Sequence, residues 1–272
     1  MEITRPFPHI WIPKPPTLEE IRTYMAGRSP MASMFPGQVR GSTVIDPLTT
    51  ALEWWDPDLG AFQDAGKTTP ATANTNPVAV LTGQIGSYGD LSNAGGSARP
   101  TLVTGAVNGH SALAFTAVAM QLKRTSAKAY PFHFVCAVKT VTWAFGTALI
   151  WDGNAAGFLL WHAGSGQSPS LILQNNIASS AHDPGLGLAT WGTVSGVMTL
   201  NGTSTMKINT GSRDTFTGGT GSTNNGFATG NGGTVLAGFG SFQIGRIAMW
   251  NDAPNNTDED ARIAAFRTYY GL

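Results

Sequence analysis

The sequence predicts an all-β protein, a two-sheet antiparallel sandwich that ends in one short helix. From Leu48 onward, short apolar stretches rich in branched and aromatic residues alternate with turns of Gly, Asn and Ser. Charged residues make up only 12% of the chain, which holds 34 glycines, so we expect many tight turns and a neutral surface. No helical pattern separates these stretches, which favours antiparallel pairing.

Each expected strand has the length and composition of a sheet element. The expected strands cover residues 51–55, 112–115, 132–140, 147–151, 157–161, 171–174, 192–200, 206–209, 234–239 and 242–250. Asp152-Gly153-Asn154 and Asn201-Gly202 supply turns typical of hairpins. Residues 217–233 form a low-complexity run that we expect to be a long exposed loop.

A polar turn and a closing helix follow the last expected strand. Thr257 is the expected N-cap, with Asp260 at the capping-box position, and Gly271 is the expected C-cap. Spacing at i, i+3 and i+7 predicts a buried stripe that consists of Ile263, Phe266 and Tyr270. The helix therefore docks on the sandwich through one face.

Residues 1–47 differ in composition from residues 48–272, and we expect them to form a separate Pro-rich arm. Half of the sixteen prolines lie there, which predicts an extended backbone. Thr17 and Gly27 bound one short helix within the arm. The apolar side chains expected to anchor the arm are Phe7, Ile10, Trp11 and Ile12. The arm either wraps over its own domain or, as we favour, docks on a neighbouring subunit.

Charge and cysteine content exclude several classes of protein. The formal net charge is zero and Lys and Arg form no cluster, so we expect no nucleic-acid partner. The single cysteine, Cys136, lies in an expected strand and is read as an inert core thiol. Neither a signal peptide nor a membrane-spanning stretch is apparent, so we expect no insertion into a membrane.

Several segments, taken in order, resemble a known family. They are Trp54-Trp55-Asp56, Phe62-Gln63-Asp64, the run VNGHSALAF at 107–115, the strand at 132–139, the run GVMTLNG at 196–202 and the closing segment 240–272. Together they resemble a concanavalin A-like, laminin-G-like jelly roll of the kind found in virion proteins of tailed bacteriophages. The arm before residue 48 has no counterpart in that domain, and Asn251-Asp252-Ala253-Pro254 departs from its usual turn.

Glucanases share the fold that this resemblance implies, so we looked for their chemistry. Glu53 is the only glutamate between residues 21 and 258, and no alternating acidic strand surrounds it. The sequence has no Gly-x-Ser-x-Gly elbow, and its histidines lack the spacing of metal ligands. We therefore expect neither an enzyme nor a cofactor. Asp152 and Asn154 could bind Ca²⁺ through their side-chain oxygens, but a simple hairpin turn also explains these two residues.

The resemblance implies a non-enzymatic structural protein on the surface of a tailed-phage virion, assembled in the host cytoplasm and decorating the capsid or tail. Its partners would be other virion proteins, and a homotrimer is expected. The alternative is a glycan-binding module that recognises a host-surface glycan. Its sugar platform would be Trp151, Asp152, Trp161 and His162, because indole faces stack on sugars and carboxylates bind hydroxyls. The competing explanation is that these tryptophans are buried in the hydrophobic core and bind no sugar.

Overall fold

The computed structural model describes residues 46–93, 98–117, 119–152, 158–162, 171–175, 178–182, 186–219, 226–230 and 240–272. The chain divides into two units, Met1–Val44 and Ile45–Leu272, and the described residues belong to the second. The expected arm, its helix and its anchors Phe7, Ile10, Trp11 and Ile12 therefore lie outside the described residues. No helix in the described ranges is both long and apolar enough to span a membrane.

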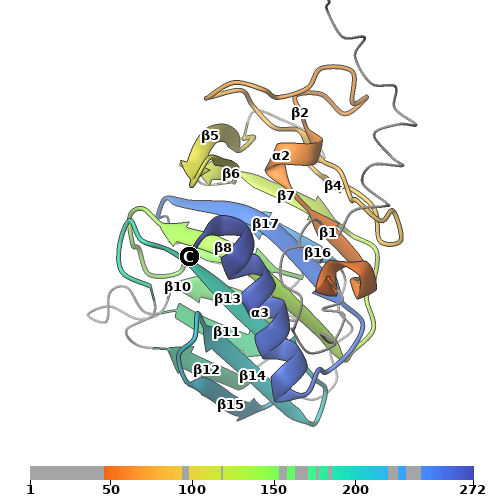
Figure 1. Cartoon of the computed structure of the whole chain (residues 1–272), viewed down its shortest axis with the longest axis vertical. Coiled ribbons are helices and arrows are strands. Elements are labelled where there is room, and N and C mark those ends of the chain that lie inside the picture. Colours follow the sequence, from red (N-terminus) through yellow and green to blue (C-terminus); the bar gives the residue numbers. More distant parts are fainter. Residues whose placement is uncertain are drawn as a thin grey trace, which may run out of the picture. The chain divides into compact units, whose positions relative to one another are not determined.

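Two antiparallel sheets form the domain, which confirms the predicted two-sheet sandwich (Figure 1). The eight-stranded sheet runs β15 (Arg213–Thr217), β14 (Thr203–Ile208), β13 (Trp191–Met198), β8 (Phe132–Thr140), β17 (Phe242–Trp250), β6 (His110–Phe115) and β5 (Thr101–Val107). The short β1 (Glu53–Trp55) also pairs with β17, beside its second half. β17 is thus the strand that joins the beginning of the domain to its centre.

The nine-stranded sheet packs against the first. It runs β12 (Ala178–His182), β11 (Leu171–Asn175), β10 (Phe158–His162), β9 (Ala148–Trp151), β16 (Phe227–Gly230), β7 (Gln121–Arg124), β4 (Leu91–Ser92), β3 (Val80–Leu81) and β2 (Ala61–Phe62). Three further elements are short or terminal: η1 (Pro47–Thr50), α2 (Pro57–Gly60) and α3 (Asn256–Tyr270).

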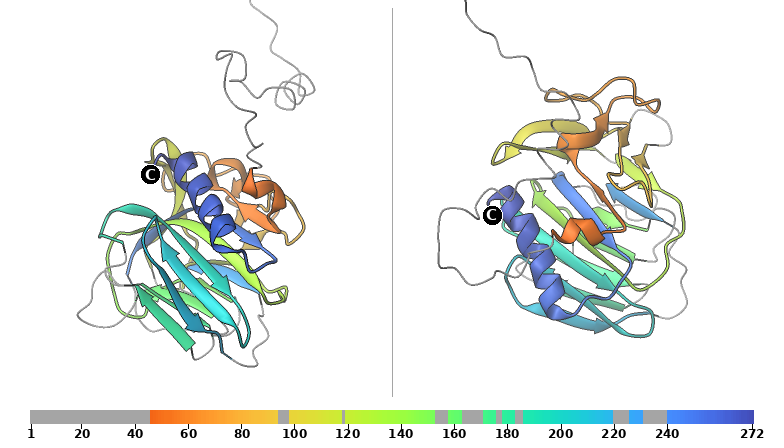
Figure 2. Two further views of the ribbon diagram at one scale, coloured as in Figure 1. Left: turned by 60° about the horizontal axis from the view of Figure 1, so that its bottom comes forward. Right: turned by 45° about the vertical axis from the view of Figure 1, so that its right-hand side comes forward.

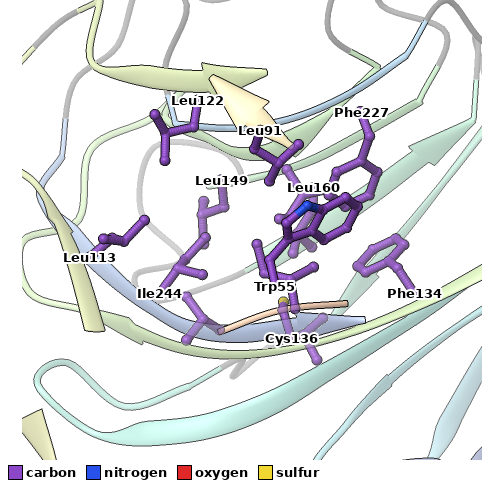
Figure 3. Packing of buried hydrophobic residues seen from close by; sticks show 14 of the residues in the cluster. Trp55, Leu91, Leu113, Leu122, Phe134, Cys136, Leu149, Leu160, Phe227 and Ile244 are labelled. Atoms are coloured by element: carbon purple, nitrogen blue, oxygen red, sulfur yellow. The ribbon is translucent and has the colours of Figure 1, made fainter. Parts of the chain in front are cut away.

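The main hydrophobic core lies between the sheets and takes side chains from both (Figure 3). Trp55 stacks on Phe227 with ring centroids 5.5 Å apart, which links β1 to β16 of the opposite sheet. Cys136 is part of this core, and burial raises the pKa of its thiol to about 12. The thiol therefore stays protonated, and the predicted core position of Cys136 is confirmed.

The outer face of the eight-stranded sheet is also apolar, and α3 covers it (Figures 1 and 2). Ile263 and Phe266 of the helix pack against Val135, Ala248 and Trp250 of the sheet. Burying an aromatic or branched side chain contributes about 1.5–3 kcal/mol, so this contact is a large part of what holds the helix. The predicted stripe of Ile263, Phe266 and Tyr270 is confirmed.

The caps of α3 agree with the prediction at one end only. Gly271 adopts the left-handed conformation, with φ of 62°, and closes the helix as expected. At the other end the N-cap is Asn255, not Thr257, and its side chain accepts a hydrogen bond from the backbone N–H of Asp258 at 3.0 Å. Asn255 and Thr257 are both good capping residues, and the turn from β17 reaches the helix two residues earlier than we expected.

The strands at 132–140 and 242–250 are confirmed with their predicted bounds, and seven others are found with shifted ends. The expected strand at 234–239 lies outside the described residues. The loop predicted for residues 217–233 is wrong in part, since β15 ends at Thr217 and β16 occupies Phe227–Gly230. β16 is enclosed between β7 and β9, so pairing on both edges outweighs its Gly- and Thr-rich neighbourhood.

Candidate functional site

Glu53, the glutamate that we considered for catalysis, is fully buried and clamps a loop. Its carboxylate accepts hydrogen bonds from five backbone N–H groups, those of Trp54, Ile85, Gly86, Tyr88 and Gly89, at 2.7–3.2 Å. A carboxylate surrounded by fixed donors has no oxygen left for a substrate. Glu53 therefore acts as a structural group at the start of β1.

A Ser-His-Glu constellation lies beneath α3, but its hydrogen bonds run in the wrong direction for His133 to act as a base on the serine. Arg262 can only donate, so Nδ1 of His133, 2.9 Å from it, accepts. Nε2 of His133 then carries the proton and donates to Ser195 Oγ at 2.8 Å. Ser195 in turn donates to Glu259 at 2.6 Å. Burial, helped by the charge of Arg262, lowers the pKa of His133 well below its ordinary value. This network fastens α3 to β8 and β13.

A second charged network joins α2, β17 and the end of α3. Arg246 binds Asp56 through two nitrogens at 2.6 and 2.9 Å, and the hydroxyl of Tyr269 donates to both Asp56 and Asp58. His110 lies 2.9 Å from Asp58. Partial burial alone would raise the pKa of Asp58, but hydrogen bonds from Ser111, His110 and Tyr269 outweigh it and hold the pKa below its usual value. The two carboxylates are close together, and internal donors occupy both.

The four residues of the predicted sugar platform occupy two faces of the nine-stranded sheet. Trp151, Asp152 and His162 are buried, with 0–2% of their surface exposed, so they present no face on which a sugar could stack. Trp151 also donates its indole N–H to the carbonyl of Gly230 at 2.8 Å. His162 points between the sheets toward Thr140, 3.1 Å away. Asn154, named with Asp152 for Ca²⁺, lies outside the described residues.

Trp161 alone of the four is half-buried, on the outer face of the nine-stranded sheet. Leu160 pairs with Ile150, whereas Trp161 pairs with Ala148, so β9 carries one extra residue at this point. Because Leu160 faces the core and side chains alternate along a strand, Trp161 points outward, into a small cluster with Ala148 and Trp151.

Two aromatic residues of the loop after β8 lie against the end of β10, Phe145 beside Trp161 and Trp143 beside the next residue, His162, and the sequence reasoning missed both. Phe145 is 54% exposed, and its ring centroid lies 5.6 Å from that of Trp161. Trp143 stacks on His162 with ring centroids 6.4 Å apart. An aromatic pair within one short loop, Trp143-Ala-Phe145, was the available signal. We call Trp143, Phe145 and Trp161 the aromatic cluster.

The aromatic cluster holds two unused hydrogen-bond donors. The indole nitrogens of Trp143 and Trp161 are shielded from solvent and lack a hydrogen-bond partner among the described residues. A buried donor without a partner costs about 1–3 kcal/mol, so such groups in a native protein call for a ligand or a water. The cluster combines an exposed ring, a half-buried indole and free N–H groups. The exposed ring and the half-buried indole can stack on a sugar.

No protein-family model matches the chain. No curated protein matches it either. Its fold is nevertheless similar to solved structures. The Trypanosoma rangeli sialidase in complex with sialic acid matches 92% of this chain with a TM-score of 0.51 and 16% identity. A GH54 α-L-arabinofuranosidase soaked with a cyclic sulfate inhibitor matches 83% with a TM-score of 0.55 and 12% identity. The binding domain of Paraclostridial Mosquitocidal Protein 1 matches 73% with a TM-score of 0.50 and 11% identity.

The chain spans 38% of the sialidase, 66% of the arabinofuranosidase structure and 52% of the toxin structure. At such low identity the likeness establishes the β-sandwich fold. The matches contradict our prediction of a non-enzymatic structural protein of a virion, because they include glycosidases. They contradict the prediction that the chain is not an enzyme on the same ground. Docking through the arm, a trimer and a location at the virion surface remain predictions.

Replacing Glu53 with Gln should lower the free energy of unfolding by about 2–4 kcal/mol, because a neutral amide loses the charge-assisted bonds and turns an NH₂ group toward backbone donors. Urea unfolding measures this loss. The control is Asp64→Asn, an exposed carboxylate that also accepts backbone N–H groups, from Thr68 and Thr69. Equal losses in the two variants would contradict the structural role of Glu53.

The buried His162 predicts a pH dependence of stability. Burial lowers its pKa to about 4, whereas the unfolded chain binds the proton near pH 6.5. The unfolded state therefore takes up more protons as pH falls, and the free energy of unfolding drops by about 2 kcal/mol from this group between pH 7 and 5. His162→Gln should remove this part of the drop and run parallel to wild type above pH 7. An unchanged drop in the variant would refute the assignment.

Proposed function

We propose that this chain is a carbohydrate-binding jelly-roll domain of the concanavalin A-like class, and that it binds glycans at the aromatic cluster. The observation that carries the proposal is the half-buried indole of Trp161 beside the exposed ring of Phe145, with the two unpaired indole N–H groups. The similarity of the fold to glycosidases supports the same chemical class of ligand.

The position of the cluster supports a ligand of several sugar units. Trp161 lies on the outer face of the nine-stranded sheet. Along β11 the residues alternate between buried and half-buried, with Ile172 opposite Trp161 and Gln174 two residues further on the same face. Polar side chains beside an aromatic ring are what an extended glycan needs, because its hydroxyl edges and its C–H faces alternate. The proposed ligand therefore lies across β10 and β11.

The proposal is consistent with the low charge of the domain. The aromatic cluster consists of neutral side chains, and burial keeps the pKa of the adjacent His162 near 4, so the imidazole is uncharged at neutral pH. A neutral site favours glycans recognised by stacking and by hydrogen bonds to hydroxyls. We expect binding at this site to change little with ionic strength.

Glycan-array binding tests the proposal. Trp161→Ala should weaken binding to the recognised glycan by about tenfold or more, and Phe145→Ala should weaken it less, because the exposed ring contributes a smaller contact. Leu59→Ala is the matched control, since Leu59 is 59% exposed on α2 and makes no part of the cluster. Release of reducing ends, measured in the same mixtures, reports whether the bound glycan is also hydrolysed.

Unchanged binding in both aromatic variants, or loss of binding in the Leu59 control alone, would refute the assignment to the aromatic cluster. The absence of binding to every arrayed glycan by the wild-type protein would refute the proposed function itself. Circular dichroism and thermal unfolding of each variant exclude loss of folding as the cause.

A further inference from the structure

A groove of about 500 Å³ lies between α3 and β14, on the opposite sheet from the aromatic cluster. Apolar side chains line part of it, among them Ile263 and Leu272. The rest is polar and includes Lys207, Asn209 and Asp260. This volume lies within the range of 300–1,000 Å³ that is usual for sites of small ligands.

Arg267 supplies a cation to this groove that the fold does not use. The residue is half-buried in the last turn of α3, and its guanidinium makes no hydrogen bond or ion pair with another described residue. The negative end of the helix dipole stabilises an arginine here by about 0.3–1 kcal/mol. This explains why a cation occurs in the last turn, but not why its side chain lies at the groove. A guanidinium with its planar donors free is the best protein group for a carboxylate.

Hydrogen-bonding groups for hydroxyls surround the same groove. Lys207 and Arg213 both bind Oδ1 of Asp260, at 2.7 and 2.8 Å, which leaves Oδ2 as a free acceptor. Asn209 accepts from the backbone of Thr193 through its carbonyl oxygen at 2.8 Å, so its amide NH₂ remains a free donor. Among the described residues, the groove therefore offers one unpaired cation, one free acceptor and one free donor beside an apolar surface.

We propose that this groove binds a monosaccharide unit that carries a carboxylate, with the carboxylate on Arg267 and the hydroxyls on Asp260 and Asn209. The C–H groups of the ring pack on Ile263 and Leu272. A neutral sugar leaves the guanidinium of Arg267 unpaired, so the site discriminates by charge. This inference is independent of the aromatic cluster, which holds no charged residue.

Titration calorimetry of the full chain with D-glucuronate tests the inference, with its neutral methyl ester and glucose as controls. Wild type should bind glucuronate at least about tenfold more tightly than the ester, as expected for a charge-assisted bidentate contact. Arg267→Gln should abolish the difference, and Trp161→Ala should preserve it. Binding should also weaken as NaCl is raised, because salt screens the ion pair.

The variant retains the fold, because no described residue depends on the guanidinium. A second readout uses the wild-type protein alone: the side-chain amide signals of Asn209 should shift in the NMR spectrum on addition of glucuronate. Equal affinities for glucuronate and its ester, an unaffected Arg267→Gln variant or unmoved Asn209 signals would each overturn the inference. Comparison with a disaccharide that ends in glucuronate shows whether the natural source is a free sugar or a chain end, and either supports the site.

Discussion

The eight-stranded sheet has to bury both of its faces, and the rest of the domain follows from this constraint. All of β8 except Lys139, and all of β17 except Gln243, is buried. One face is satisfied by the opposite sheet, through the core around Trp55 and Phe227. The other would expose an apolar surface to water, and α3 removes it by packing Ile263 and Phe266 there. The outer face of the nine-stranded sheet, onto which Trp161 points, is therefore the face that we propose for a glycan.

The helix that covers the sheet carries charged side chains, and burial requires these charges to be paired. Most of the groups that resemble catalytic residues therefore have a structural role. Glu259 is only 1% exposed, and Ser195 and Arg213 satisfy its two oxygens. Arg246 is held by Asp56 and lies 3.5 Å above the ring of Tyr269. Removing one partner from such a network leaves a buried charge uncompensated, which costs far more than the pair contributes. Arg267, at the rim of α3, stands outside these networks.

The parts of the fold that the sequence predicts are those with a strong local pattern. β8 and β17 are long runs of branched and aromatic residues, and the stripe of α3 has helical spacing, so both followed from the sequence. β7 (Gln121–Arg124) is polar and β16 lies in a Gly-rich run, and the two pair with each other although they lie far apart in the sequence. β15 (Arg213–Thr217) is also polar and is a strand because it forms a hairpin with β14. Local propensity contains no information about such pairing.

The candidate site was predictable in the same limited way. Trp161 was identified because an aromatic residue in a strand is visible in the sequence, but which face of the sheet it points to, and which His162 points to, depends on how the folded sheets pack. Trp151 was named as an equal partner, yet the hydrogen bond to Gly230 and the packing on Ala228 bury it. Phe145 and Trp143 were missed because their loop meets β10 only in the folded sheet.

A glycan that stacks on Trp161 and Phe145 changes the surroundings of the buried indole N–H groups of Trp143 and Trp161. Their N–H signals can be followed directly by ¹⁵N-edited NMR, since tryptophan indoles resonate apart from the backbone. On addition of an oligosaccharide that the protein binds, the signals of Trp143 and Trp161 should shift. Those of Trp55, Trp151 and Trp250, which already donate to Gly89, Gly230 and Pro47, should stay in place. Saturable binding that leaves the first two signals unmoved would contradict the account.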